Sequence, residues 1–322
     1  MSEHFIKNIE IKNFKCFEDF KAEGFGRVNL IGGKNNVGKT AFIEALHVNA
    51  HSQDINYFFS TLTYIKMARE KMNLVDKEYS SERVLKYLEL TSGIVTKSNI
   101  HNTLFKVDEK AGIRKYIFHF RDEKIEVNVN EFSAQFIKVS NIQYLDNFGF
   151  SNGEIMVSYA AVQKKDKEDY LNKLLNEFDS TIENFKIIDE QPQCRINGEY
   201  LDLTELGDGT KHLVSVVNSL YKAEDGFLFL DEIENGIHYT NLDKLWEIIL
   251  TISKQQNVQV FATTHSKECI ESYARVAKKL EDKDISYSII TKLKSGKLHH
   301  SLYDYDLLEN SVIEQEHEVR GW

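Results

Sequence analysis

A glycine-rich stretch near the amino terminus has the spacing of a phosphate-binding loop. The chain there runs VNLIGGKNNVGKT, in which Gly33, Gly38, Lys39 and Thr40 complete the pattern G-x-x-x-x-G-K-[ST]. Glycine lets a tight loop bring backbone N–H groups up to phosphate oxygens without a Cβ in the way. The lysine can reach the β- and γ-phosphates, and the threonine hydroxyl can ligate Mg²⁺. The loop, which also contains Asn36, therefore predicts a nucleotide site, with an unliganded glycine-rich turn as the weaker alternative.

Two carboxylates follow an apolar strand further along the chain. Phe227–Leu230 reads FLFL and is followed directly by Asp231 and Glu232. A buried strand with carboxylates at its carboxyl end is the Walker B arrangement. Asp231 is predicted to hold Mg²⁺ beside Thr40, largely through water, and Glu232 to orient or deprotonate an attacking water. The alternative is an acidic surface turn after a core strand, because acidic residues are common in turns.

A third apolar strand, over residues 258–263, ends just before His265. A neutral histidine at such a strand tip can contact the γ-phosphate and the attacking water, whereas a lone histidine elsewhere is usually structural. Gly207 and Gly209 open a predicted helix over residues 211–221, and a glycine pair at a helix start can form a second anion site. Two such sites in one molecule are useful if the second closes on the nucleotide of another copy. A helix start without a ligand is the alternative.

These residues need elements that bring them together. A strand at 28–31 and a helix at 41–50 flank the phosphate loop, and strands alternate with helices through the rest of the chain. This alternation predicts an α/β fold. The other expected elements are strands at 5–17, 20–25, 103–108, 114–120, 124–129 and 136–145, helices at 54–74, 81–95 and 166–178, and a hairpin at 193–203.

Bulk properties limit the classes of protein that fit. The chain has 322 residues, an apolar fraction of 42% and a net charge of −10, which argues against a protein that coats nucleic acid over its whole surface. Cys16, Cys194 and Cys269 are isolated, so neither a zinc site nor a disulfide framework is predicted. The sequence has no signal-peptide core and no apolar run of about 18 residues. We expect a cytoplasmic protein without a membrane partner.

The motifs, taken in order, resemble those of one ATPase family. The segments NFKCF, GGKNNVGKT, LGDGTKHL, FLFLDEIENGIH and FATTHS are similar to an ABC-type ATPase head of the SMC/RecF/OLD branch, closest to small OLD-like AAA-family ATPases that lack a TOPRIM nuclease domain. The resemblance implies an α/β P-loop NTPase head with a mixed central sheet, an antiparallel β-lobe and a helical insert. It implies one ATPase domain over residues 1–322, with core lobes at 1–50 and 195–322 and an insert of helices and antiparallel strands at 51–194.

The same resemblance implies roles for individual residues. Glu232 and His265 would be catalytic, Gly207 and Gly209 would belong to the signature loop, and residues 235–238 would form the D-loop. The sequence departs from the family at Gly207, where a serine is usual, and at Asp208, whose charge would oppose a triphosphate. Gln143 is the candidate Q-loop glutamine, with a structural role as the alternative.

The sequence lacks several motifs and domains that occur in related ATPases and in GTPases. The insert lacks sustained heptads, which argues against the long coiled-coil members of the branch. The residues after His265 are too few for a TOPRIM domain. A D-x-D at residues 282–284 is predicted to be a solvated turn between a helix and a strand. No N-K-x-D motif for guanine is present, so ATP with Mg²⁺ is the expected ligand pair.

Two functions remain open. The favoured one is an ATPase that forms a homodimer around two ATP molecules and acts on DNA in repair or phage defence. The alternative is a nucleotide-gated regulator or scaffold for a separately encoded effector protein, a toxin or nuclease, without a direct DNA role. Basic residues could touch a phosphate backbone, although solvated faces are the more usual explanation of such clusters. They are Lys164, Lys165, Lys167, Lys292, Lys294, Lys297, His299 and His300.

Overall fold

A mixed six-stranded sheet lies at the centre of the molecule. The computed structural model describes residues 3–70, 93–110, 112–120, 123–128, 140–147 and 149–314, and it describes the backbone alone for 66–70 and 312–314. The strand order is β15-β14-β3-β13-β12-β8. The strands are β3 (Val28–Gly32), β8 (Ile142–Leu145), β12 (Phe227–Leu230), β13 (Gln259–Thr263), β14 (Ile285–Lys292) and β15 (Leu298–Tyr303).

Five of these strands are parallel, and β15 pairs antiparallel with β14 at one edge. The loops that follow β3, β12 and β13 therefore emerge at the same edge of the sheet, where α/β proteins bind ligands. The predicted α/β fold with a mixed central sheet is confirmed. One edge strand of this sheet, β8, comes from within residues 51–194, so the predicted insert also contributes to the central sheet.

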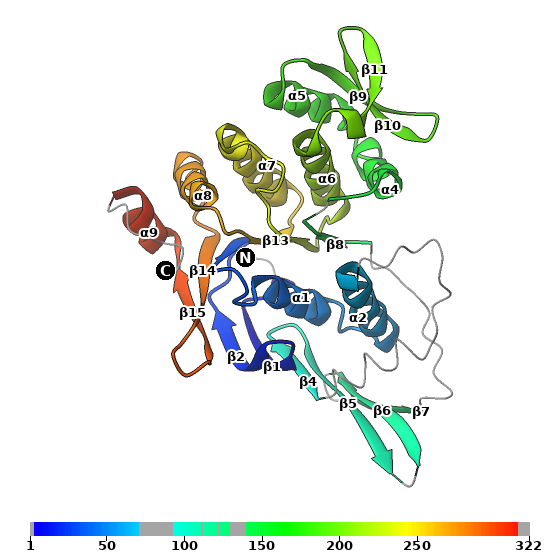
Figure 1. The fold of residues 1–322 in the computed structure, drawn as a ribbon, viewed down its shortest axis with the longest axis vertical. Helices are drawn as coiled ribbons and strands as arrows, with labels where there is room; N and C mark the ends of the chain where they lie inside the picture. The colour runs from blue at the N-terminus through cyan, green and yellow to red at the C-terminus, as the bar shows by residue number, and fades with distance from the viewer. Residues whose placement is uncertain are drawn as a thin grey trace.

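Helices cover both faces of the central sheet (Figure 1). Strand β12 shows why, because Leu228 and Leu230 enter one apolar core while Phe227 and Phe229 enter the other. The first core is covered by α4 (Asn152–Gln163), α6 (Asp208–Lys222), α7 (Leu242–Gln255) and α8 (Lys267–Lys279), with α5 (Glu168–Phe178) packed on α6. The second is covered by α1 (Lys39–Ala50) and α2 (Ile55–Glu70).

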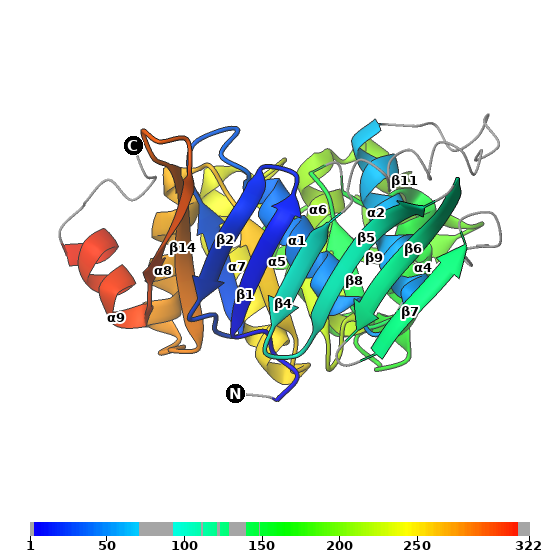
Figure 2. The same cartoon turned by 90° about the horizontal axis from the view of Figure 1, so that it is seen from below.

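A second six-stranded sheet, fully antiparallel, packs on the far side of α1 and α2 (Figure 2). Its order is β2-β1-β4-β5-β6-β7. The sequence predicts the first two strands and the later meander separately, and the pairing of Ile11 with Thr96 joins them into one sheet. Its strands are β1 (Asn8–Phe14), β2 (Phe17–Glu23), β4 (Ile94–Ser98), β5 (Asn102–Lys110), β6 (Ile113–Phe120) and β7 (Glu123–Asn128).

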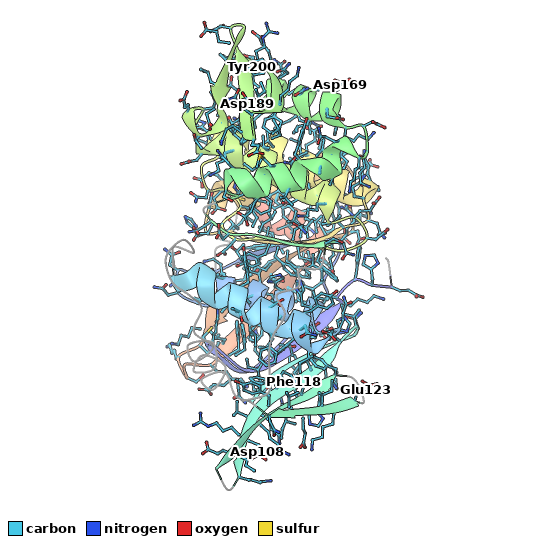
Figure 3. The ribbon with its side chains drawn as sticks, turned by 90° about the vertical axis from the view of Figure 1, so that its right-hand side faces the viewer. Asp108, Phe118, Glu123, Asp169, Asp189 and Tyr200 are labelled. Atoms are coloured by element: carbon cyan, nitrogen blue, oxygen red, sulfur yellow. The ribbon has the colours of Figure 1, made fainter. Side chains whose placement is uncertain are left out.

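A small three-stranded sheet lies at the opposite end of the molecule, where Tyr200 and Asp189 stand far from Phe118 and Asp108 (Figure 3). It contains the predicted hairpin, which turns at residues 197 and 198 with φ values of 50° and 83°. Its strands are β9 (Ile182–Ile188), β10 (Gln191–Ile196) and β11 (Glu199–Asp202). The remaining short elements are η2 (Leu203–Glu205), η3 (Tyr239–Asn241), α9 (Tyr305–Leu308) and η4 (Glu309–Glu314).

One predicted helix needs correction, and one observed helix is not predicted. The helix predicted at 81–95 falls mostly outside the described residues, and its last two residues, Ile94 and Val95, begin β4 instead, directly after Gly93 with φ +84°. Residues 71–74, 129 and 136–139, at the ends of three other predicted elements, also lie outside the described part. Helix α4 is not predicted, although Ser151 and Glu154 form the capping box that marks its start.

The predicted solvated turn at residues 282–284 is wrong for Asp282. Its carboxylate is buried and forms an ion pair with the guanidinium of Arg27. Arg27 also contacts the hydroxyl of Ser253 and donates to the carbonyl of Leu250 at 3.2 Å. A buried arginine needs such partners, so the aspartate belongs to the folded core.

In the part of the chain that the structure describes, no helix is both long and apolar enough to cross a membrane.

Candidate active site

An open cleft of about 550 Å³ lies where the loops after β3, β12 and β13 meet. Seven of the predicted site residues line it together, although they come from three distant parts of the chain. They are Asn36, Gly38, Lys39, Thr40, Asp231, Glu232 and His265. The cleft is also lined by Lys15, Cys16, Asn35 and Ala41.

The loop between β3 and α1 presents backbone donors to this cleft. Gly38 is the N-cap of α1 with φ +101°, and no side chain caps the helix. A Cβ at this position would lie 2.5 Å from the Sγ of Cys16, so only glycine fits. The first turn of α1 contains no acidic residue. Its open N–H groups and the positive end of its dipole therefore suit an anion.

Lys39 lies across the loop. Its Nζ donates hydrogen bonds to the carbonyls of Gly33 at 2.9 Å and Lys34 at 3.1 Å. Desolvation lowers its pKa, and the nearby carboxylates of Glu232, Glu234 and Asp231 act in the opposite direction. The ammonium group of this partly buried lysine thus donates its two hydrogen bonds to neutral carbonyl oxygens. Phosphate oxygens can take the place of these carbonyl oxygens.

Asp231 is held by two hydroxyl groups. Its Oδ1 accepts hydrogen bonds from Thr40 at 3.0 Å and from Thr263 at 2.7 Å. Burial raises the pKa of Asp231, and these hydrogen bonds partly offset that rise. Among the described residues no group of three His, Cys, Asp or Glu side chains could enclose a metal. One carboxylate and one hydroxyl nevertheless fit Mg²⁺, which keeps several waters and takes further ligands from phosphates.

Glu232 has an unusual backbone. Its φ is +52°, a left-handed conformation that is uncommon for a residue other than glycine. Thr263 stabilises this turn, because its Oγ1 accepts from the N–H of Glu232 at 2.8 Å and its carbonyl accepts from the N–H of Ile233 at 3.1 Å. The conformation separates Glu232, which lines the cleft, from Glu234, which does not.

His265 pairs with Glu234 instead of Glu232. The Nδ1 of His265 lies 3.2 Å from Oε1 of Glu234, and the same oxygen accepts from the N–H of His265 at 3.0 Å. The sequence assigns no role to Glu234. The signal in the sequence is its place two residues after Glu232. The sheet then brings this turn beside the loop after β13.

Gly207 and Gly209 line a separate pocket of about 490 Å³, with Gly236, His238 and Asn241 among its other residues. Gly207 has φ +87° and is the N-cap of α6, which has no side-chain cap. A Cβ on Gly209 would lie 2.6 Å from the carbonyl oxygen of Gly236, so the helix start packs closely on the predicted D-loop. This pocket shares no lining residue with the cleft.

Other candidates lie away from both pockets. Gln143 is buried, and its Nε2 donates to the carbonyls of Ser140 at 2.7 Å and Ile142 at 3.0 Å, which favours the structural alternative. His300 is partly buried against Ser288, and burial lowers its pKa to about 4, so it is not a phosphate-binding cation at neutral pH. Lys165 forms an ion pair with Glu224 at 2.6 Å.

One buried histidine lies on α6 and lines neither of the two pockets. His212 of α6 contacts the backbone of Ile233, and burial lowers its pKa to about 4. It lines a smaller cavity with Asn147, Asp208 and Lys211, among others. Helix α6 and the turn after Asp231 are thereby joined through an uncharged ring. No motif in the sequence points to this residue.

The chain is similar to several known proteins. A family model described as an AAA ATPase domain matches residues 121–270. An ATP/GTP phosphatase of Helicobacter pylori is 25% identical over 342 residues, covering 89% of this chain and 91% of that protein. The DNA replication and repair protein RecF of Streptococcus agalactiae is 23% identical over 200 residues, covering 58% of this chain and 48% of RecF.

A solved structure shares the fold. It is an SMC head bound to the C-winged helix domain of ScpA, with a TM-score of 0.56 and 12% sequence identity. The similarity covers 93% of this chain and 98% of the SMC head chain. At this identity the likeness describes the fold alone.

Proposed function

Because this chain is an ATPase of the SMC/RecF-like ABC type, we propose that it hydrolyses ATP in the cleft beside β3, β12 and β13. The observation that carries this proposal is the meeting of Lys39, Thr40, Asp231, Glu232 and His265 in one cleft. Phosphoryl transfer relies on positioning and charge neutralisation, and these residue types supply both.

The phosphate loop would bind the triphosphate. The N–H groups at the start of α1 would donate to phosphate oxygens, and Lys39 would exchange its carbonyl partners for the β- and γ-phosphates. Thr40 and Asp231 would hold Mg²⁺, which when bound neutralises charge on the phosphates. Gly33 and Asn36 shape this loop, with Asn36 at φ +63°.

Glu232 would act on the attacking water as a base or an orienting group. It lines the cleft with His265, and Thr263 fixes its backbone. We expect Glu232→Gln to keep ATP binding while reducing turnover roughly 10²-fold or more. Lys39→Ala should weaken ATP binding itself, whereas Lys254→Ala, an exposed lysine of α7, should change neither. Phosphate release and ATP binding test all three variants, and normal hydrolysis in Lys39→Ala would contradict the assignment.

We propose that the second pocket serves the ATP of another copy. Gly207 and Gly209 start a helix without a side-chain cap, yet their pocket is separate from the cleft of the same chain. A head-to-tail dimer would bring each pocket onto the partner's nucleotide and complete two sites. The cleft lining has lysines but no arginine, so a second source of positive potential is useful.

For the biological role we propose DNA-associated repair or phage defence. The partial similarity to RecF supports a DNA role, as do Lys292, Lys294 and Lys297, which are exposed in and beside the turn between β14 and β15. DNA binding with and without a slowly hydrolysed ATP analogue, over a salt series, tests this. ATP-independent or absent binding would count against it. The OLD-like assignment stays a prediction.

The alternative is a nucleotide-gated regulator or scaffold for a separately encoded effector protein. The outer face of the antiparallel sheet favours it, because lysines there pair with acids and leave little net positive charge. Glu10 lies 3.2 Å from Lys12 and 3.4 Å from Lys21, and Glu126 lies 3.3 Å from Lys115. We also propose that residues 1–322 form one ATPase domain. We further propose a cytoplasmic location, supported by three cysteines that form no disulfide.

A further inference from the structure

Glu234 is a carboxylate that the roles proposed above leave unused. Its side chain is only 10% exposed, although the next residues, Asn235 and Gly236, are exposed. Its Oε1 accepts from the backbone N–H of His265 at 3.0 Å and of Ser266 at 3.2 Å. The same oxygen lies 3.2 Å from the ring Nδ1 of His265. One carboxylate oxygen therefore accepts from the backbone of the loop after β13 and also lies against the ring of His265.

The second oxygen of this carboxylate is the unexpected feature. Oε2 of Glu234 is buried and has no hydrogen-bond partner among the residues that the structure describes. Burying a carboxylate oxygen without a partner costs free energy. A neutral amide could accept from the N–H groups of His265 and Ser266 without burying a charge. A charged acceptor attracts a ring N–H more strongly than a neutral amide does, so the ring of His265 gives the negative charge a use beyond holding the loop.

The contact with Glu234 determines which ring nitrogen of His265 can accept a hydrogen bond in the cleft. A carboxylate only accepts hydrogen bonds, so an oxygen 3.2 Å from Nδ1 favours the tautomer with its proton on Nδ1. In a neutral imidazole the other nitrogen, Nε2, is then an acceptor. His265 lines the cleft together with Glu232 and Lys39. The lone pair of Nε2 is thus available to a water molecule in the cleft.

We propose that Glu234 is a positioning residue that fixes the Nδ1–H tautomer and the orientation of His265, so that Nε2 accepts a hydrogen bond from the attacking water. This inference rests on the proposed function, because it concerns the same hydrolysis. Glu232 and His265 would then contact the water from two sides, and Glu234 would act only through the histidine. Partners of this kind commonly orient histidines at metal and catalytic sites.

The tautomer can be measured directly. In protein labelled with ¹⁵N-histidine, the ring nitrogens of His265 are assigned by their loss in His265→Gln. We expect Nε2 of His265 to show the shift of an unprotonated nitrogen in the wild-type protein and an averaged shift in Glu234→Gln. Glu268→Gln is the matched control, because Glu268 accepts from the Ser266 hydroxyl at 2.8 Å in the same segment and is exposed. An Nε2–H tautomer in the wild-type protein would overturn the proposal, and this result needs no variant to fold.

Kinetics separate positioning from a merely structural role. We expect Glu234→Gln to lower kcat for ATP roughly tenfold, with KM and ATP affinity within about twofold of the wild type. His265→Gln should show a comparable loss, and the double variant should lose no more than the larger single loss, because both act through one ring. Glu268→Gln should hydrolyse ATP normally. Multiplying losses, or normal turnover in Glu234→Gln, would overturn the proposal.

The variants distinguish a wrong assignment of the hydrolysis site from a wrong positioning role for Glu234. If Lys39→Ala and Glu232→Gln leave hydrolysis unchanged, the proposed site is wrong whatever the tautomer of His265. If those variants behave as expected while Glu234→Gln is normal, only the positioning role is wrong. Unfolding temperatures of all variants establish that the comparison is between folded proteins, and the wild-type spectrum stands as a test if Glu234→Gln proves unstable.

Discussion

The hydroxyl of Thr40 donates a hydrogen bond to Oδ1 of Asp231 at 3.0 Å, across 191 positions of the chain. Thr40 ends the phosphate-loop motif and is the second residue of α1, and Asp231 directly follows β12. Strand β3, which precedes the phosphate loop, and strand β12 are not neighbours, because β13 lies between them. Thr263 at the end of β13 donates to the same Oδ1, so the carboxyl ends of three adjacent strands meet at this carboxylate.

The charge of Asp231 should matter more than its hydrogen bonds. Asp231→Asn keeps an oxygen that can accept from Thr40 and Thr263, but it removes the charge that Mg²⁺ requires. We expect Mg²⁺-dependent hydrolysis to fall roughly 10²-fold, with nucleotide binding in EDTA nearly unchanged. Asp225→Asn, an exposed turn residue with φ +53°, is the control and should hydrolyse ATP normally. Full Mg²⁺-dependent activity in Asp231→Asn would rule out the metal role.

Removing Asp282 should destabilise the fold. Asp282→Ala leaves the buried guanidinium of Arg27 without its counter-charge, which typically costs about 3–5 kcal/mol. Asp19→Ala breaks an exposed pair with Lys12 at 3.7 Å and should cost about 1 kcal/mol or less. Urea unfolding measures both. A loss for Asp282→Ala no larger than that for Asp19→Ala would show that the pair is not a buried structural contact.

Stability should fall at mildly acidic pH because of His212. Its pKa is lowered from the ordinary 6.5 to about 4, so the unfolded chain binds the proton more readily than the folded one. The stability that the neutral ring of His212 contributes is complete above pH 6.5 and is lost as the pH falls toward 4. The free energy of unfolding is lower by about 2 kcal/mol at about pH 5.

His212→Gln should make the unfolding free energy less dependent on pH in this window, whereas His299→Gln, an exposed histidine, should not. His300, whose pKa burial also lowers to about 4, titrates in the same range and remains in both variants. Urea unfolding at about pH 7.5 and about pH 5 provides the comparison. An equal pH dependence in His212→Gln and the wild type would contradict the assignment.

Dimerisation should depend on ATP and on Gly207. Glu232→Gln with ATP should sediment as a dimer, because slow hydrolysis keeps the nucleotide in place. Adding Gly207→Ala should weaken this dimer, since φ +87° and ψ 159° suit only glycine and the helix start would change. Gly296→Ala, with φ +85° in an open turn, is the matched control.

Complementation tests the shared site further. A mixture of Lys39→Ala and Gly207→Ala proteins should hydrolyse ATP faster than the sum of the two alone, because one site of a mixed dimer combines an intact loop with an intact partner pocket. If ATP leaves the mass unchanged and mixing restores nothing, the shared-site mechanism is wrong.

The sequence alone determined the features that consecutive residues create. The phosphate loop, the apolar strand before Asp231 and the hairpin at residues 197 and 198 depend on local spacing and on glycine or asparagine at positive φ. Seven predicted site residues line one cleft because parallel strands end at one edge of a sheet. The order of the motifs along the chain was enough to indicate this fold.

Only the tertiary structure decided which of these residues face one another. Glu232 and Glu234 are two positions apart, but a left-handed residue in the turn sends one to the cleft and the other to His265. Asp282 is a surface turn by its local sequence and a buried partner of Arg27 in the fold. Gly207 and Gly209 lie in a pocket separate from the phosphate loop. Each outcome depends on packing between distant segments, where burial and hydrogen bonding select among conformations that the local sequence leaves equally open.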